Sequence, residues 1–561
     1  MTPKTHAITT SSSVPRRLLL TLALVAAMAS ALPAVSHATN GFIFLSRLDQ
    51  YSGGSPWDYN DVWGYKDPVS GDEYAILGTY NGTSFVNVTD PFNPVEVGFI
   101  PGNRSGWRDM HTYQGRCYIV TEGRDSTSAG GGLQIVSLAD AENPVLVRRK
   151  HAFTAHTLWI DEPAGIAYCN GADGLAPGFK VYDLAANPDN PPLVVDNGTT
   201  YVHDSWAGNG VMYTADINNG GQMRLLNVSG LPGSTSTPQL GVVNYGGGAT
   251  HNIWPHPDGI HVLTTDEHCS NGHIRVWDVS DPSDIIEVAA VPDVPNTDVH
   301  NVYMKGTTAY AAWYAAGIRA YDMSNPLSPA LLGFYDTTPA TNGCNGCWSV
   351  YPFLPSGVIA CSDMSQGLVL VAHVGNSGFI SGTVTSSANG LPIAGAIVNV
   401  PGFYNKSVAT DANGTYNFEL PSGATTVIVS AVGFNSDNAS VSIPVGGTVT
   451  HNVALGSGAT GVGNGNGVAG VVTVSSAWPN PARSGSAFDL ALPSESNVRA
   501  DVYDLSGRRI RSLASGVYAA GRHTIHWDAR DDAGQSVAAG TYLYRVEAAG
   551  QARSVKTTLV R

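Results

Sequence analysis

The stretch IRVWDVSDPSDIIEVAAV, residues 274–291, holds the pattern that decides the fold of this chain. Apolar and polar residues alternate on both sides of an Asp-Pro turn, as expected for a hairpin of two short strands. The same pattern recurs in TSFVNVTDPFNPVEVGFI from Thr83 and in IRAYDMSNPLSPALLGFY from Ile318. Further copies begin at Gly132, at Phe179 and, more loosely, at Met223. Most of the chain is therefore a repeated β unit.

Each repeat also contains an earlier hairpin, whose first strand carries an aromatic residue three positions after its opening residue. These openings are Asn60/Trp63, His156/Trp159, His203/Trp206, His251/Trp254, His300/Tyr303 and Trp348/Tyr351, and a seventh begins near Met110. Successive openings from His156 to Trp348 are 47–49 residues apart. Four short strands in a period of about 40–50 residues are typical of a propeller blade. The sequence predicts an all-β protein with a seven-bladed β-propeller over residues 39–375.

The last repeat ends with GLVLVAHV near Val374 and lacks a fourth strand. The segment GFIFLSRLDQY from Gly41 has the alternation of such an outer strand. We expect the Gly41–Tyr51 segment to pair with the last blade and close the ring, because this removes two free sheet edges.

Residues 1–38 have the features of a secretory signal peptide. Lys4, Arg16 and Arg17 precede an apolar run from Leu18 to Leu32, which is short for a membrane span. Small residues around Ala38 suit a cleavage site. We expect the mature chain to begin near Thr39 and to be extracellular or attached to the cell surface.

The repeats resemble the LVIVD-repeat proteins, and the region from Gly41 to Val374 resembles the choice-of-anchor B family of exported propellers. NVTDPFNPVEVG, THNIW, VHNVY and WSVYPFLPSG are the motifs that carry this resemblance. The resemblance implies a propeller fold and export, and it implies no particular activity.

Two smaller modules follow the repeats. Residues 378–456, with TDANGTYNFELPSG, resemble the carboxypeptidase regulatory-like module, and residues 457–470 read as a Gly-rich flexible linker. Residues 471–561, with DLSGR and AGTYLYRV, resemble the immunoglobulin-like C-terminal domain of FlgD-like modules and of type IX (Por) secretion tails. That resemblance implies two small β-sandwiches, the second read by an export machine or used as a surface anchor.

The composition excludes several classes of protein. The 561 residues carry a net charge of −15, which argues against nucleic acid as a partner. With 64 Gly and 33 Pro the chain is too rich in breakers for helical bundles, and 43% hydrophobic residues exclude global disorder. After residue 38 no run of 18 apolar residues occurs, so we expect no transmembrane helix in the mature chain.

Six cysteines are too few for a disulfide scaffold. Cys117, Cys169 and Cys361 lie in strand-like runs, where free thiols behave as small apolar side chains. Cys344 and Cys347 form a CxxC, for which a local disulfide, a pairing with Cys269 and free thiols all remain open.

Four histidines suggest a site. His156, His203, His251 and His300 occupy the same position in four consecutive repeats, so they should lie at one level around the propeller axis. Acidic residues recur at the ends of the second strands, and we expect Asp216 and Asp266 to lie close behind the histidines. Neutral imidazoles with carboxylates behind them would bind a transition metal such as Cu, Fe or Zn. His111 should face the other way, because Met110 occupies the equivalent position.

The same histidines also allow a purely structural interpretation. Thr157, Asp204, Asn252 and Asn301 follow them directly, and four polar residues there suit a hydrogen-bonded network between blades. No GxSxG, HExxH or P-loop motif is present, so no catalytic residue is assigned. Two functions compete: an exported binding or adhesion protein for an extracellular protein, peptide or glycan, and a metal-dependent secreted oxidoreductase.

Overall fold

The structure is a computed structural model, and it describes residues 39–559 with gaps. The gaps are residues 54–56, 125–130, 151–152, 174–177, 199, 247, 269–271, 292–293, 340–342, 458–471, 476, 478–481, 483–484, 493, 505–506, 520 and 550. The predicted signal peptide and nearly all of the predicted Gly-rich linker lie outside the described residues. The described chain is β-structure throughout apart from one 3-10 turn at Ile217–Asn219, so the all-β fold class is confirmed.

The described residues before position 375 form seven successive antiparallel sheets. The first sheet contains β3 (Tyr59–Lys66), β4 (Glu73–Thr79), β5 (Gly82–Asn87) and β6 (Val95–Pro101). The second contains β7 (Arg108–Tyr113), β8 (Arg116–Thr121), β9 (Leu133–Ser137) and β10 (Val145–Lys150). The third contains β11 (Thr157–Asp161), β12 (Ile166–Asn170), β13 (Phe179–Asp183) and β14 (Leu193–Asn197). The fourth contains β15 (Asp204–Gly208), β16 (Val211–Ala215), β17 (Gln222–Asn227) and β18 (Gln239–Asn244).

The remaining three sheets follow the same plan. The fifth contains β19 (Thr250–Pro255), β20 (His261–Asp266), β21 (Ile274–Asp278) and β22 (Ile286–Ala290). The sixth contains β23 (Asn301–Lys305), β24 (Thr308–Ala312), β25 (Ile318–Asp322), β26 (Ala330–Tyr335) and the short β1 (Thr39–Asn40). The seventh contains β27 (Cys347–Tyr351), β28 (Val358–Asp363), β29 (Gly367–His373) and β2 (Phe42–Leu48).

The Asp-Pro segments make the turns that join the third and fourth strands. In the fifth sheet Asp281 Oδ1 accepts hydrogen bonds from the backbone N–H and the hydroxyl of Ser283, at 2.9 and 2.6 Å. Asp90 in the first sheet holds the backbone N–H of Phe92 in the same way, at 3.1 Å. Asp and Asn favour such turns because their side chains bond to the backbone two residues on.

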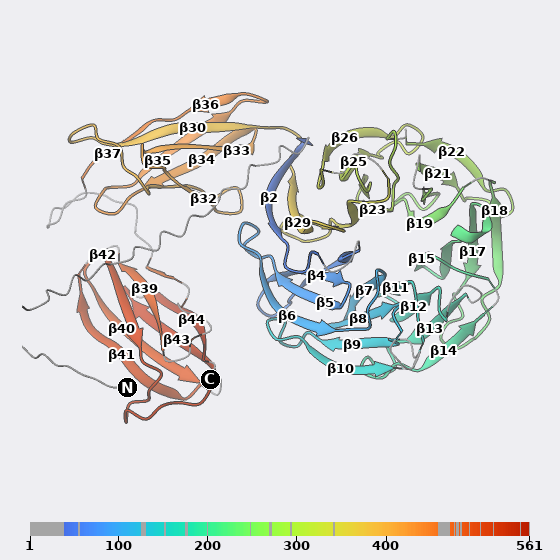
Figure 1. Ribbon diagram of the computed structural model, residues 1–561, viewed down its shortest axis with the longest axis horizontal. Coiled ribbons are helices and arrows are strands. Elements are labelled where there is room, and N and C mark those ends of the chain that lie inside the picture. Colours follow the sequence, from blue (N-terminus) through green and yellow to red (C-terminus); the bar gives the residue numbers. More distant parts are fainter. Residues whose placement is uncertain are drawn as a thin grey trace, which may run out of the picture. The chain divides into compact units, whose positions relative to one another are not determined.

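The first strands of the sheets are arranged in a closed circle, which Figure 1 shows as a ring of sheets. Each first strand contacts the next, in the order β3, β7, β11, β15, β19, β23 and β27, and β27 contacts β3 again. Side chains at one register position on these strands therefore converge on one axis, as in a β-propeller.

The N-terminal segment closes this ring. β2 pairs with β29 in antiparallel register, with Phe42 opposite His373 and Leu48 opposite Leu368. β1 pairs with β26 of the neighbouring sheet, with Asn40 opposite Phe334. Residues 39–48 thus hold two neighbouring sheets together.

The cysteines differ in part from expectation. Cys344 is disulfide-bonded, whereas Cys347 is a buried free thiol, so the local CxxC disulfide is wrong. Cys117, Cys169 and Cys361 are buried free thiols as expected. The Cys361 Sγ lies 2.6 Å from the Cys347 Sγ on the neighbouring strand.

A sandwich of two sheets follows the ring. One sheet contains β30 (Ser377–Ser386), β33 (Thr415–Pro421), β36 (Thr448–Thr450) and β37 (Val453–Leu455). The other contains β31 (Ile397–Val400), β32 (Lys406–Ala409), β34 (Gly423–Ser430) and β35 (Asp437–Ile443). Inward side chains such as Ile380, Val398 and Val427 are fully buried between them.

A second compact unit begins after residue 458. Its first sheet contains β38 (Thr473–Val474), β39 (Ser486–Leu492) and β42 (Gly521–Trp527). Its second sheet contains β40 (Ser496–Asp504), β41 (Arg509–Tyr518), β43 (Gly540–Ala548) and β44 (Gln551–Leu559). Among the described residues of the chain, no helix has the length and apolarity needed to cross a membrane.

Candidate metal centre

The four predicted histidines lie at one level, because each occupies the same place in its sheet. The backbone N–H groups of His156, His203 and His300 donate to the last carbonyl of the neighbouring second strand, at 2.8, 2.9 and 2.8 Å. The acceptors are Asn170, Ala215 and Ala312, which end β12, β16 and β24. His251 lies within β19, whose register shifts between Thr250 and Ile253.

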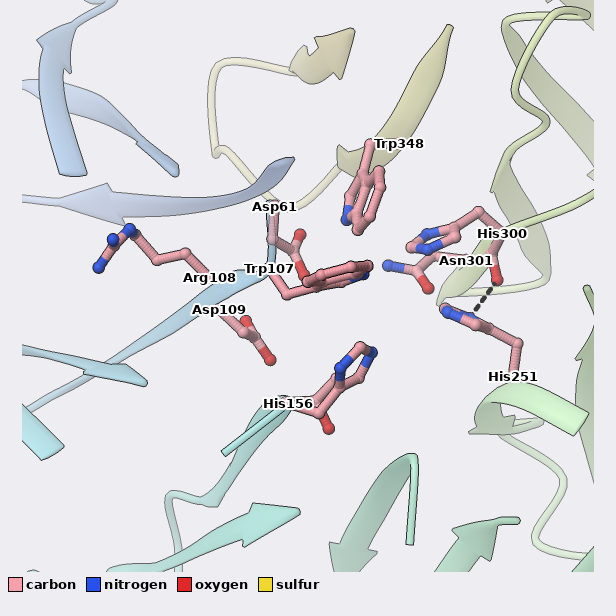
Figure 2. Close-up of a pocket in the computed structure, with 10 residues that line it drawn as sticks. Asp61, Trp107, Arg108, Asp109, His156, His251, His300, Asn301 and Trp348 are labelled. Atoms are coloured by element: carbon pink, nitrogen blue, oxygen red, sulfur yellow. Dashed lines mark hydrogen bonds between the residues drawn. The ribbon is translucent and has the colours of Figure 1, made fainter. Parts of the chain in front are cut away.

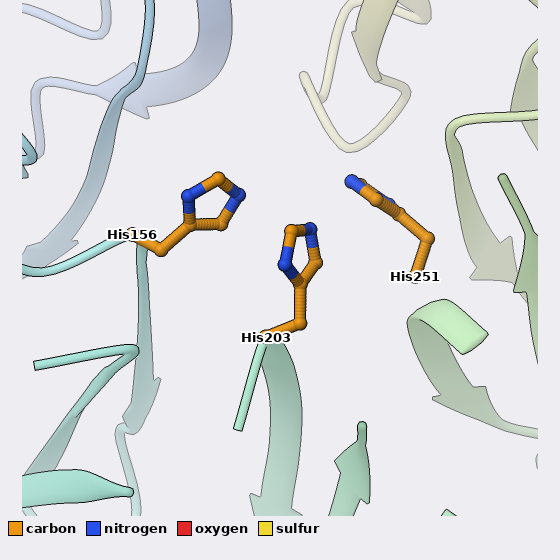
Figure 3. A group of neighbouring side chains, drawn as sticks. All are labelled: His156, His203 and His251. Carbon is orange, nitrogen blue, oxygen red and sulfur yellow. The ribbon is translucent and has the colours of Figure 1, made fainter. Parts of the chain in front are cut away.

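The four imidazole rings form an arc around the axis. Ring centroids are 4.0 Å apart for His156 and His203, 4.4 Å for His203 and His251, and 3.9 Å for His251 and His300. Figure 3 shows the rings of His156, His203 and His251 directed toward a shared space. The structure thus brings all four histidines together.

In the described part of the channel, two sets of side chains offer ligand atoms close enough to share a metal ion. One set is His156, His203 and His251, and the other is His251, Glu267 and His300. Within each set one atom per residue lies within 4.8 Å of the others. Ligands of a tetrahedral metal with bonds of about 2.1 Å lie about 3.4 Å apart. Small side-chain movements would bring either set to that geometry.

Hydrogen bonds fix which nitrogen of each ring is available. His156 Nδ1 lies 2.6 Å from Glu122 Oε1 and donates to it, and His251 Nδ1 donates to the His300 carbonyl at 3.0 Å. In their neutral form both rings therefore carry the lone pair on Nε2. His203 Nδ1 bonds to the Tyr201 hydroxyl at 3.2 Å, and its Nε2 is buried without a hydrogen-bond partner. A carboxylate or carbonyl on the far nitrogen is the usual companion of a metal-binding histidine.

The surroundings favour the neutral form of the His203, His251 and His300 rings, which is the form that binds metals. Burial lowers the pKa of His203 well below its usual value, and the neighbouring imidazoles lower it further. Burial likewise lowers the pKa of His300 and of His251. Burial raises the pKa of Glu122, but the hydrogen bond from His156 and the charge interaction with it together outweigh burial, and the net pKa is lowered.

Asp216 and Asp266 do not join the histidines, which corrects the sequence-based expectation. Both are fully buried and make ion pairs inside their own sheets, Asp216 with Arg224 Nε and Asp266 with Arg275 Nε, each at 2.6 Å. Side chains alternate between the two faces of a strand. Glu267 directly follows Asp266 and therefore points to the other face, toward His251.

Glu122 and Glu267 are the carboxylates that approach the site. Glu122 contacts His156, and Glu267 Oε2 lies 3.6 Å from His251 Nε2. Glu267 Oε1 also accepts a hydrogen bond from the Tyr314 hydroxyl at 2.6 Å. Both glutamates directly follow the end of a second strand, β8 or β20, and this position is the sequence signal that identifies them.

A layer of polar side chains lies next to the histidines along the channel, and it includes Asp204 and Asn252, which directly follow His203 and His251 in the chain. Asp109 Oδ2 accepts the backbone N–H of Leu158 at 2.6 Å, and Asp204 Oδ2 accepts the Asn252 amide at 2.8 Å. Asn252 Oδ1 in turn accepts the N–H of Val302 at 3.0 Å. These bonds connect neighbouring sheets. This agrees with the structural interpretation of the sequence, in which the polar residues form a hydrogen-bonded network between blades.

Figure 2 shows one pocket that is lined by three of the histidines, His156, His251 and His300, with Asp61 and Asp109 on the side opposite His251 and His300. Burial raises the pKa of Asp61 to about 6. Burial also raises the pKa of Asp109 well above its usual value, and Asp61 adds to this effect. Close, buried carboxylates cannot both ionise readily, so this pair retains a proton near neutral pH.

His111 belongs to a third, aromatic layer. Its ring stacks on Trp63 with centroids 3.6 Å apart and meets the edge of Trp159 at 5.2 Å. Burial lowers the pKa of His111 to about 3. His111 lies apart from the other four histidines, but the prediction that it faces the other way is wrong. It lines the channel together with Asp109, whereas Met110 between them is buried in the core.

Comparison with known proteins identifies the two C-terminal modules. Residues 379–456 match the model of the carboxypeptidase regulatory-like domain, and residues 480–552 match the FlgD Ig-like domain. Both predicted module types are confirmed, and domains of these types are typical of exported proteins. No curated protein matches the chain by sequence.

Solved structures that match this chain share little sequence with it. One is a protein from Lactobacillus plantarum with 12% identity and a TM-score of 0.43, covering 61% of this chain and 96% of its own. Another is the computationally designed Ika8 protein, with 9% identity and a TM-score of 0.37, covering 56% of this chain and 83% of its own. The assigned families therefore apply to the C-terminal modules, and the function of the ring has to be argued from its own residues.

Proposed function

We propose that this chain is an exported binding protein whose propeller holds a transition metal ion, of the class of copper, iron or zinc, in its channel. The single observation that carries the proposal is the convergence of the His156, His203 and His251 imidazoles on one space in the channel. The rings of His156 and His251 are oriented by hydrogen bonds to their other nitrogens, and the three rings offer ligand atoms within 4.8 Å.

The buried Nε2 of His203 supports this proposal energetically. A buried polar atom without a partner costs about 1–3 kcal/mol of folding free energy. A metal ion bound at this nitrogen would offset that cost. It would also remove the repulsion between the His203 Nε2 atom and the ring nitrogens of His156 and His251. His300 and Glu267 lie beside His251 and would supply further ligands.

Metal analysis of protein purified without chelator tests the proposal. We expect the wild-type chain to retain a transition metal in the channel, and His203→Ala to lose one equivalent while keeping its circular dichroism spectrum. His526→Ala, an exposed histidine of the C-terminal unit, is the matched control and should lose none. Equal metal content in wild type and His203→Ala overturns the proposal and leaves the histidines a structural role.

A metal-dependent secreted oxidoreductase is the second candidate. Asp61 and Asp109 favour it, since these carboxylates line the same pocket as His156, His251 and His300 and retain a proton near neutral pH. A one-electron step coupled to this proton would shift the reduction potential by about 59 mV per pH unit. In copper-loaded protein we expect Asp109→Asn to make the reduction potential less dependent on pH. A wild-type reduction potential that does not change with pH would exclude coupling of electron transfer to this proton.

We further propose the domain assignment and the location that accompany this function. The division is a signal peptide over 1–38, an LVIVD-type, choice-of-anchor B-like propeller over 39–375, a regulatory-like sandwich over 378–456, a linker over 457–470 and a sorting or anchoring domain over 471–561. The partner would be an extracellular protein, peptide or glycan, and the last domain would engage a secretion or anchoring machinery.

Cell fractionation tests the export part of the proposal. We expect the full chain in the surface fraction of its native host, and we expect a chain truncated after residue 470 to be released or retained inside. An identical location for both chains would remove the sorting role of residues 471–561.

A further inference from the structure

A second group of potential metal ligands lies at the other end of β19. His251 is near the start of this strand, and the turn from His256 to His261 connects its end to β20. His256, Asp258 and His261 each offer one ligand atom, and these atoms lie within 4.8 Å of one another. The group shares no residue with the channel site, so it stands independently of the proposed function.

The two oxygens of Asp258 have separate roles. Oδ1 accepts the backbone N–H groups of Ile260 and His261, at 2.8 and 3.0 Å, and so holds the turn. Oδ2 faces both histidines and lies 3.0 Å from His256 Nδ1 and 2.7 Å from His261 Nδ1. The turn therefore needs only one oxygen and leaves the other between two imidazoles.

The hydrogen bonds of His256 indicate which of its ring nitrogens can bind a metal ion. Its Nε2 donates to the Met323 carbonyl at 3.0 Å, and its Nδ1 accepts the backbone N–H of Asp258 at 3.3 Å. In the neutral ring Nδ1 therefore carries the lone pair, and the Asp258 Oδ2 atom faces it at 3.0 Å. Two acceptors so close repel each other unless a positive charge lies between them. His256 is only 5% exposed, so water screens this repulsion poorly.

We propose that His256 Nδ1, Asp258 Oδ2 and His261 Nδ1 bind a divalent transition metal ion such as Zn²⁺. Two imidazoles and one carboxylate are a donor set that suits zinc, and its fourth position is available to water or to an outside ligand. The Met323 carbonyl fixes the His256 tautomer from the neighbouring sheet, as outer partners of metal-binding histidines do. Asp258 is at the surface, so a metal ion can enter from solvent.

The test uses the full mature chain carrying His251→Ala, which removes the ligand that both channel sets share, so that metal in the channel does not obscure the result. Titration with Zn²⁺, or with Co²⁺ followed by visible absorption, should show one equivalent bound at this turn. Asp258→Asn keeps an Asx-type turn and removes the charge, and His261→Gln removes one nitrogen. Each variant should weaken Zn²⁺ binding by more than about 100-fold. Loss of a residue that only orients a metal ligand costs about 10–100-fold in affinity, and these variants remove a ligand itself.

His526→Ala is the control and should leave this affinity unchanged. His261 is partly exposed, so we expect His261→Gln to fold even if Asp258→Asn does not, and this second variant then decides the test. Unchanged Zn²⁺ affinity in a folded variant overturns the proposal. An NMR spectrum in which His256 stays doubly protonated in excess Zn²⁺ also overturns it, because a proton then supplies the positive charge. Failure of the channel site alone would leave this binding intact.

Discussion

The Nδ1 atom of His156 lies 2.6 Å from Oε1 of Glu122, and this contact joins the third sheet to the second. Glu122 directly follows β8, and His156 directly precedes β11. The carboxylate holds the proton of His156 on Nδ1 and turns Nε2 toward His203 and His251. The contact thereby couples the packing of neighbouring sheets to the chemistry of the channel.

Replacing Glu122 with Gln should weaken metal binding in the channel by about 10–100-fold, because the amide is a poorer acceptor and no longer fixes the tautomer of His156. Competition titration against a chelator of known affinity measures this change. Glu547→Gln, an exposed position in the C-terminal unit, should leave the affinity unchanged. Equal affinities in both variants would show that Glu122 has only a packing role.

His111 should make folding sensitive to acid. Its pKa is lowered to about 3 by burial, whereas an unfolded histidine has a pKa of about 6.5. Between these values the unfolded chain binds a proton that the folded chain does not, so the free energy of unfolding decreases as the pH falls. The expected slope from this residue is about 1.4 kcal/mol per pH unit.

His111→Phe should remove that part of the slope, since Phe keeps an aromatic ring against Trp63 and does not titrate. Urea unfolding of both proteins at several pH values from 4.5 to 7 gives the comparison. Plotted against pH, the free energies of unfolding of the two proteins should have the same slope above about pH 6.5, because there the histidine is neutral in the unfolded chain as well. Parallel curves over the whole range would mean that His111 is protonated in the folded protein.

The N-terminal strand should be essential for the stability of the ring. Ile43 in β2 is 2% exposed and packs into the core, so Ile43→Ala should lower the free energy of unfolding by about 2–5 kcal/mol. Phe44, the next residue, is 43% exposed, and Phe44→Ala should cost much less. Denaturant unfolding distinguishes the two. Similar effects at both positions would argue that β2 is not part of the folded core.

Cys347 and Cys361 should form a disulfide in exported protein. Their sulfur atoms are 2.6 Å apart on adjacent strands, near the 2.05 Å of a disulfide bond, and an oxidising compartment favours the bond. A bridge of that span should add about 3 kcal/mol of stability. Peptide mapping without reduction should recover the two cysteines in one cross-linked species. Cys117 and Cys169 serve as internal controls and should be recovered as alkylated thiols, and alkylation of Cys347 as well would contradict the prediction.

The repeated pattern by itself determined the class of the fold and the level of the four histidines. Alternation around Asp-Pro turns specifies hairpins locally, because strand periodicity and turn chemistry act over a few residues. Equivalent positions in a closed ring must converge on its axis, so His156, His203, His251 and His300 could be grouped from their spacing alone. The two C-terminal modules were likewise recognisable from short motifs.

Only the tertiary structure decided which carboxylates and which nitrogens serve the site. The choice between Asp266 and Glu267 depends on which face of β20 meets the channel, and a shift of one residue reverses that face. β19 changes register between Thr250 and Ile253, whereas β11 and β15 pair regularly with their neighbours. The proton on His256 is fixed by the carbonyl of Met323, 67 residues away in the chain. Contacts of this kind arise from the packing of one sheet on the next, which local sequence patterns do not encode.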